Sequence, residues 1–166
     1  FLAVKQASID SILDAVPGYC SILLVFDPLA TTIEQIRVKI DALFEDLDQF
    51  ELPEPSSIEI PVVYGDEYGP DLAWVAKYHK TTREEVILRH TQNQYQVYMI
   101  GFIPGFPYMG ELPETLETPR KKTPRTAVPR GSVGLAQKQT GIYPARSPGG
   151  WQIIGRTPLT LFDPLK

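Results

Sequence analysis

The distribution of proline and glycine is the feature of this sequence that most limits its fold. Ten of the 16 prolines and nine of the 12 glycines lie in the last 66 residues. Proline removes a backbone donor and breaks helices, and no helical period persists in this part of the chain. Short β runs occur instead at 132–136, 151–155 and 159–162, separated by Pro-Arg, Thr-Gly and Pro-Gly-Gly. This pattern of prolines, glycines and short β runs predicts that the second half is an all-β barrel or sandwich with long, proline- and glycine-rich loops.

The stretch from Tyr98 to Gly110 begins as a strand and becomes a loop. Pro104-Gly105 and Pro107 interrupt an apolar run that holds Phe102, Phe106 and Tyr108. A buried strand does not tolerate prolines that remove its ladder donors, so the chain must leave the sheet here. Two interpretations stay open. The loop is the wall of a concave site, or it is a hydrophobic plug, since aromatic clusters are usually core.

The first hundred residues alternate helix and strand patterns. We expect helices at 8–16, 32–47, 71–78 and 83–91, a central strand at 20–26, and an edge strand at 58–64 that Pro61 interrupts. Thr32 with Gln35, and Thr82 with Glu85, form capping boxes that open two of the helices. Up to residue 64 the order suggests an α/β layer one strand short of a ferredoxin-like βαββαβ unit. Residues 51–57 are a linker by composition, which predicts domains at 1–54 and 58–166.

Charge is segregated along the chain, whose net charge is −4. From Thr118 to Phe162 there is no Asp or Glu, and this stretch carries eight Lys and Arg side chains. Such a segment creates a positive field on one part of the surface. Nucleic acid is a weak explanation, because the whole chain is acidic and the cations alternate with Pro and Gly. Two alternatives remain: the segment binds a small carboxylate or phosphate, or it is a solvated basic face that docks an acidic partner or nothing.

No standard catalytic or metal-binding signature occurs. His79 and His90 are not spaced i, i+4, there is no phosphate-loop Gly-Lys-Ser/Thr, and Ser147-Pro148-Gly149 is no nucleophile elbow. We expect His79 at the surface and His90 either in the core or as a proton-transfer group. Cys20 is the only cysteine and lies in an apolar run, so we expect a buried thiol and no metal site. No run of 18 apolar residues and no signal peptide is seen, which favours a cytoplasmic protein.

Several long motifs now carry a resemblance. They are Tyr64-Gly-Asp-Glu-Tyr-Gly-Pro-Asp-Leu72, Glu85-Val-Ile-Leu-Arg-His90, Gly101-Phe-Ile-Pro-Gly-Phe-Pro-Tyr108, Thr118-Pro-Arg-Lys-Lys-Thr-Pro-Arg125, Val128-Pro-Arg-Gly-Ser-Val133, Gln139-Thr-Gly-Ile-Tyr-Pro144 and Ser147-Pro-Gly-Gly-Trp-Gln-Ile-Ile-Gly-Arg-Thr-Pro158. In this order they resemble the family that contains the B-type subunit of 5-oxoprolinase, the first subunit of allophanate hydrolase and the sporulation-kinase inhibitor. The similarity covers about residues 19 to 164. It does not separate the members of the family.

The resemblance implies an α+β protein, with a small ferredoxin-like domain followed by a cyclophilin-like β-barrel of the carboxyltransferase type. Relatives normally carry a strand and a helix before Phe1 and a strand after Lys166, so we expect both domains to be incomplete. The implied activity is ATP-dependent hydrolysis of 5-oxo-L-proline to L-glutamate. ATP would be held by an assembly with two other 5-oxoprolinase subunits, a barrel-containing one of the C type and a third of the A type. We expect this chain to be inactive alone.

Candidate roles follow from the chemistry of lactam hydrolysis. Arg125 and Arg130 are expected to clamp a carboxylate or phosphate, and His90 to transfer a proton. The remaining candidates for substrate binding are Phe102, Pro104, Phe106, Tyr108, Ser132, Gln139, Thr140 and Tyr143. We predict that Phe106 and Tyr108 line a pocket and do not merely fill the core.

Rival functions remain open on the sequence alone. Similar chains inhibit a sensor histidine kinase by binding it, which needs no catalysis. A third interpretation is a subunit related to allophanate hydrolase or urea carboxylase. The implied fold resembles peptidyl-prolyl isomerases, but fold alone does not imply that activity.

Overall fold

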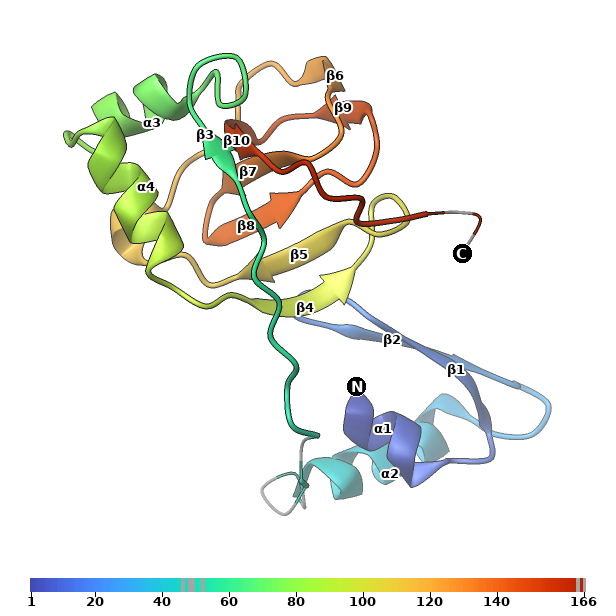
Figure 1. The fold of residues 1–166 in the computed structure, drawn as a ribbon. Coiled ribbons are helices and arrows are strands. Elements are labelled where there is room, and N and C mark those ends of the chain that lie inside the picture. Colours follow the sequence, from blue (N-terminus) through green and yellow to red (C-terminus); the bar gives the residue numbers. More distant parts are fainter. Residues whose placement is uncertain (46, 48–49, 52, 164, 166) are drawn as a thin grey trace. The chain divides into compact units, whose positions relative to one another are not determined.

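The computed structural model describes the chain except residues 46, 48, 49, 52, 164 and 166. It divides into two compact units, Phe1–Ile58 and Glu59–Lys166, and each is considered by itself (Figure 1). No helix in the described part of the chain is long and apolar enough to span a membrane.

In its described residues the first unit contains two α-helices and a β-hairpin (Figure 1). Its elements are α1 (Leu2–Ala7), β1 (Ile12–Pro17), β2 (Ile22–Phe26) and α2 (Ile33–Glu45). The strands are antiparallel, with Ala15 opposite Leu24 and Val16 opposite Leu23. Ala15 is buried, whereas Leu23 is 63% exposed. The hairpin therefore buries one face and leaves apolar side chains on the other.

Three expectations for this unit are wrong. Residues 12–17 form a strand and not a helix, because backbone pairing with β2 outweighs the local helical spacing of a short apolar run. β2 pairs only with β1 among the described residues, so it is not a central strand. Cys20 is exposed, since it lies in the turn that joins the two strands.

The capping box at the start of α2 is confirmed. The Thr32 hydroxyl accepts from the backbone N–H of Gln35 at 3.3 Å, and the Gln35 side chain accepts from the backbone N–H of Thr32 at 3.1 Å. Ile36 is buried, but Ile33 and Phe44 in the same apolar stripe are exposed. Only part of the predicted stripe is therefore covered within this unit.

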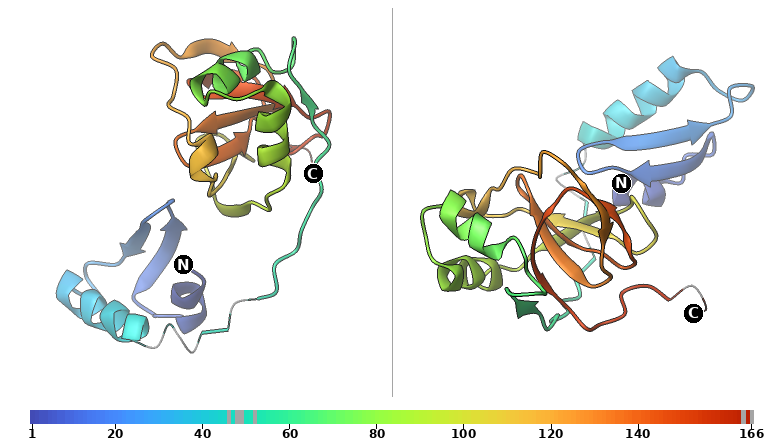
Figure 2. Two further views of the ribbon diagram at one scale, coloured as in Figure 1. Left: turned by 90° about the vertical axis from the view of Figure 1, so that its left-hand side faces the viewer. Right: turned by 90° about the horizontal axis from the view of Figure 1, so that it is seen from above.

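The second unit is built on a six-stranded antiparallel sheet. Its helices are α3 (Leu72–Tyr78), α4 (Arg83–Thr91) and the 3-10 helix η2 (Glu114–Leu116). Its strands are β3 (Val63–Tyr64), β4 (Gln96–Ile100), β5 (Pro107–Gly110), β6 (Arg125–Val128), β7 (Ser132–Ala136), β8 (Gln139–Ile142), β9 (Ser147–Gly149) and β10 (Gln152–Arg156). The sheet order is β3-β10-β7-β8-β5-β4, and β6 and β9 form a separate pair. Among the described residues the sheet ends at β3 and β4, so a closed barrel is not confirmed (Figure 2).

The two faces of this sheet carry different cores. Val133, Leu135 and Ile154 face α3 and α4 in one apolar cluster. Ala136 and Ile153 belong to a second cluster with Phe106, Tyr143 and Trp151. The period of two along each strand sends alternate side chains to the two clusters.

Most elements of the second unit lie where the sequence predicts them. Strand 132–136 and helix 83–91 have the predicted bounds, and β3 lies at the predicted sheet edge. β3 pairs with β10, so this strand belongs to the second unit and not to the first α/β layer. Residues 159–162 are not a strand. Among the described residues no strand pairs with this run.

The N-terminus of α4 provides a direct test of capping. Thr82 Oγ1 accepts from the backbone N–H of Glu85 at 3.1 Å. Thr82→Ala is expected to lower the free energy of unfolding by about 1 kcal/mol, because this N–H loses its acceptor. Thr82→Ser keeps the hydroxyl and is the matched control. Chemical denaturation of both variants measures the difference, and equal losses would contradict the capping role.

Candidate functional site

Residues 118–125, called the basic strap below, are fastened at several points to the sheet of the second unit. Thr118 and Gln137 exchange two backbone hydrogen bonds, and the N–H of Lys121 donates to the Gly150 carbonyl at 2.8 Å. The Gln152 side-chain amide donates to the Pro119 carbonyl at 3.0 Å. Arg125 then begins β6 opposite Gly149. The strap is therefore held in place by hydrogen bonds to its backbone along its length.

Asp71 anchors the charged side chains of the strap. This residue is only 5% exposed. Its Oδ1 accepts from Arg125 Nη2 at 2.7 Å and from Lys121 Nζ at 3.1 Å. Its Oδ2 accepts from the backbone N–H of Ile153 at 2.7 Å. Burial acts to raise the pKa of Asp71, but hydrogen bonds from Arg125, Ile153 and Lys121 outweigh it and hold the pKa below its usual value.

Two buried polar atoms, one on a residue of this ion-pair cluster and one on a residue bonded to the strap, have no hydrogen-bond partner within the described residues. They are Nη1 of Arg125 and Oε1 of Gln152. Gln152 directly precedes Ile153, whose N–H donates to Asp71. An unpaired buried donor on a charged group is costly, which favours a further acceptor at this position. Arg125 thus already binds one carboxylate, inside the chain, and keeps one nitrogen unsatisfied.

His90 lies in a chain of buried hydrogen bonds between α4 and the sheet. Its Nε2 is 3.0 Å from Thr140 Oγ1, and Thr140 Oγ1 donates to the Gly134 carbonyl at 3.2 Å. The hydrogen bonds assign the proton to Nε2, so Nδ1 accepts from the Tyr64 hydroxyl at 2.8 Å. Burial lowers the pKa of His90 to about 4 and raises the pKa of Tyr64 to about 12. His90 is therefore neutral at pH 7 and bonded to side chains on both ring nitrogens.

Phe106 is the centre of the aromatic cluster that the loop supplies. It is 1% exposed. Its ring centroid lies 4.8 Å from Tyr108, 5.1 Å from Tyr143 and 5.4 Å from Trp151. A Cβ placed on Gly141 would lie 2.9 Å from the tip of the Phe106 ring, so glycine is required for this close approach. Phe106 and Tyr143 thus lie inside the second core cluster, and Tyr108 packs against its edge.

The remaining candidates are not gathered in one place. Ser132 is buried with no partner for its hydroxyl in the described chain, and Gln139 is partly exposed. Arg130 is exposed and donates to the Thr160 hydroxyl. Phe102 is 58% exposed and Pro104 is also exposed. The structure brings Arg125 together with Lys121 and Asp71, His90 with Thr140, and Phe106 with Tyr108 and Tyr143.

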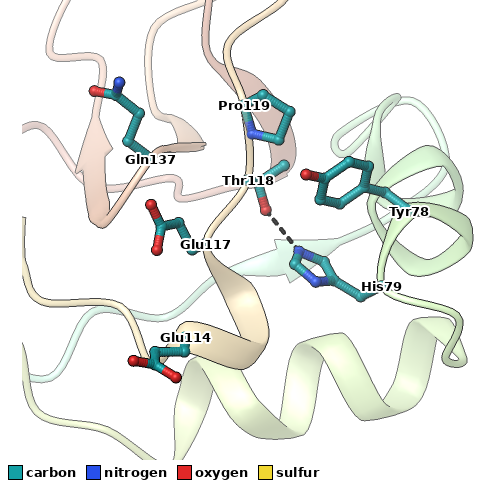
Figure 3. A pocket seen from close by; sticks show the side chains of 7 residues that line it. All are labelled: Tyr78, His79, Glu114, Glu117, Thr118, Pro119 and Gln137. Carbon is teal, nitrogen blue, oxygen red and sulfur yellow. Dashed lines mark hydrogen bonds between the residues drawn. The ribbon is translucent and has the colours of Figure 1, made fainter.

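An open pocket of about 440 Å³ lies elsewhere in the second unit (Figure 3). It is lined by Tyr78 and His79 from the end of α3, by Glu114, Glu117 and Thr118 around η2, and by Gln137. None of the residues predicted as catalytic or substrate-binding lines it. His79 is half-buried and its Nε2 lies 3.0 Å from Thr118 Oγ1. Burial, aided by the charge of Arg89, lowers the pKa of His79.

Asp71 is the site residue that sequence reasoning missed. It follows Pro70 and precedes a helix, a pattern that predicts a helix start. Its side chain makes no cap hydrogen bond, and it reaches instead to residues 121, 125 and 153. The acid-free segment was the available signal, because any carboxylate that pairs with its eight cations must come from another part of the chain. Within the described residues no group of three or more His, Cys, Asp or Glu side chains is arranged to hold a metal ion.

Comparison with known families identifies the class of this chain. All 166 residues match the family model described as carboxyltransferase domain, subdomain C and D. The chain belongs to that family. This agrees with the resemblance that its motifs indicate.

Individual relatives are more specific. The chain is 53% identical over 138 residues to the B-type subunit of 5-oxoprolinase from Haemophilus influenzae, covering 83% of this chain and 61% of that protein. It is 43% identical to the B-type subunit of 5-oxoprolinase from Escherichia coli O157:H7, covering 99% of this chain and 75% of that protein. The crystal structure of TTHA0988 superimposes with a TM-score of 0.79 at 36% identity, covering 99% of this chain and 31% of that one. The chain thus spans about three fifths of the first of these relatives.

Proposed function

We propose that this chain is part of a subunit of an ATP-dependent 5-oxoprolinase, which hydrolyses the lactam of 5-oxo-L-proline to L-glutamate. The observation that carries the proposal is the identity of 53% and 43% to two proteins named as the B-type subunit of 5-oxoprolinase. The names of these relatives favour it over a kinase inhibitor and over an allophanate- or urea-related subunit. Because these relatives are named as subunits, we propose an assembly in which the C-type and A-type chains are the partners.

The basic strap is the part of this chain that we propose contacts the substrate. 5-Oxoproline carries a carboxylate, and the Arg125 guanidinium has a buried Nη1 without a partner in the described residues. A second carboxylate, from the substrate, would satisfy it as Asp71 satisfies Nη2. Lys121 adds a further positive charge beside it. The chain's own role is then to bind and orient the anion.

The sequence holds no phosphate-loop motif, so no residue of this chain is singled out for a nucleotide. His90 is neutral and fully hydrogen-bonded, which leaves it no free nitrogen for proton transfer in this arrangement. We therefore propose that ATP is held by another chain of the assembly and assign it no residue here. We also propose that the ferredoxin-like layer and the barrel are completed in the assembled protein.

The test is to assay glutamate release from 5-oxoproline and ATP with and without the partner subunits. We expect turnover only in the mixture, and a lower rate when salt screens the charged surfaces. Full turnover by this chain alone would show that the partners are unnecessary. No turnover by the complete mixture would contradict the proposed function. Loss of sensor-kinase autophosphorylation on adding the chain would then favour the inhibitor.

Arg125→Ala is expected to lower kcat/KM for 5-oxoproline by roughly 30-fold, about 2 kcal/mol, because the substrate anion loses a charged hydrogen bond. Arg125→Lys is not expected to restore it, since an ammonium cannot bind Asp71 and the substrate with two separate arms. Steady-state kinetics of the assembled enzyme measure both variants. Arg130→Ala, at an exposed arginine of the same acid-free segment, is the matched comparison. Normal kinetics in Arg125→Ala would remove Arg125 from the site.

A further inference from the structure

We propose that Asp71 is a positioning residue, which holds the Arg125 guanidinium by one nitrogen so that the other is presented to the substrate anion. This inference rests on the proposed function for its substrate. It gives a role to Asp71, which lies within the motif at residues 64–72 but to which the sequence analysis assigned no function. Its support is the geometry around a single buried carboxylate.

Asp71 is itself rigidly held. Its own backbone N–H donates to the Ile153 carbonyl at 2.9 Å, and its Oδ2 accepts from the Ile153 N–H at 2.7 Å. Backbone and side chain are thus both fixed against β10. A residue held to one strand by its backbone N–H and by one carboxylate oxygen makes a defined reference for any group that binds its other oxygen.

Arg125 binds that carboxylate through only one of its two terminal nitrogens. Nη2 donates to Oδ1 at 2.7 Å, and Lys121 Nζ shares the same oxygen at 3.1 Å. Nη1 remains buried and unpaired among the described residues. A carboxylate that only neutralised Arg125 would gain most by binding both arms, which is the usual geometry of this pair. The one-armed contact instead leaves a charged donor for a second acceptor.

Positioning and simple charge predict opposite changes in the KM for 5-oxoproline when Asp71 is replaced by asparagine. Asp71→Asn removes one negative charge, so the surroundings of Arg125 become more attractive to any anion. If charge alone decided binding, the KM for 5-oxoproline would fall. If orientation decides it, the KM rises, because the guanidinium is released. The amide oxygen of asparagine still accepts from the Ile153 N–H, so the change is confined to Arg125 and Lys121.

The experiment is steady-state kinetics of the assembled enzyme with Asp71→Asn. We expect KM for 5-oxoproline to rise at least tenfold while kcat changes less than threefold. In an Arg125→Ala background the same substitution is expected to have less than a twofold effect on KM, because Asp71 acts through Arg125. Glu85→Gln is the matched control. It removes a carboxylate that binds Arg89 at 2.7 Å on α4, and KM should not change. An unchanged or lower KM in folded Asp71→Asn would overturn the proposal.

A second measurement does not depend on activity or on a folded variant. In wild-type protein with labelled arginine, nitrogen NMR should show slowly exchanging, distinct Nη signals for Arg125. A freely rotating Arg125 guanidinium would overturn the proposal even if turnover is normal. If the signals are restrained but the complete assembly does not use 5-oxoproline, the proposed function fails and the positioning of Arg125 by Asp71 stands.

Discussion

Phe106→Ala is expected to lower the free energy of unfolding of the second unit by about 3–5 kcal/mol. The side chain is 1% exposed and its ring lies 4.8 to 5.4 Å from those of Tyr108, Tyr143 and Trp151. Truncation leaves a cavity that these large rings cannot close without moving off their positions. A loss of this size is expected for a core residue. A ring that only lined a substrate pocket would change the free energy of unfolding much less.

Phe102→Ala is the matched control, because it removes the same ring from the same loop. Phe102 is 58% exposed and touches Phe106 edge-on at 5.7 Å. We expect it to cost less than about 1 kcal/mol. Denaturant unfolding of both variants measures the difference. Similar losses would mean that Phe106 is not the centre of the cluster, and lost turnover with unchanged stability would restore the pocket interpretation.

Acidification is expected to destabilise the second unit through His90. In the unfolded chain a histidine titrates near its usual pKa of about 6.5, whereas burial lowers the pKa of His90 to about 4 in the folded protein. The unfolded state therefore binds more protons between these values. The stability that depends on neutral His90 is complete above pH 6.5 and is lost as the pH falls toward 4. The loss over this interval is about 3 kcal/mol.

His90→Gln separates this contribution from other groups. The variant should be less stable at pH 7, because Tyr64 and Thr140 lose a well-placed partner. Its stability should change less than that of the wild type between pH 6.5 and 4. His79 also destabilises the folded protein as the pH falls, and Asp71 does so below about pH 4. The quantity to compare is therefore the difference between the stability curves of the wild type and of His90→Gln. Parallel curves would show that His90 is not buried as a neutral group.

Local signals in the sequence predict local structure well. The two predicted capping boxes involve residues three apart, and in both the threonine accepts from the backbone N–H three residues on. The reciprocal side-chain bond is seen only between Gln35 and Thr32, since the Glu85 side chain binds Arg89. The helix expected at 8–16 fails because its fate depends on a partner strand, and the pairing of Val16 with Leu23 is not visible in a short window. Whether the sheet of the second unit closes into a barrel is equally hard to predict from short stretches of sequence, because the order of strands is set by contacts between residues far apart in the chain.

In the candidate site, too, the sequence identifies individual residues but not their partners. Charge segregation indicates the segment that contains Arg125, but the carboxylate that binds Arg125 is 54 residues earlier in the chain. His90 can be selected as the titratable group of an apolar helix face. Its hydroxyl partners come from β3 and β8, and only the fold decides between core and catalysis. The sequence therefore indicates which residues carry charge, and not which of those charges are already neutralised inside the protein.

The chain's single cysteine and its two tryptophans fall in different units. Cys20 is exposed in the turn of the β1–β2 hairpin, whereas Trp74 and Trp151 both belong to residues 59–166. A thiol-reactive fluorophore therefore labels the first unit at one position without mutagenesis, while tryptophan emission observes only the second. Recorded together during one denaturation experiment, the two signals show whether the units unfold at once or in sequence. A melting curve followed by tryptophan emission alone contains no direct signal from residues 1–58.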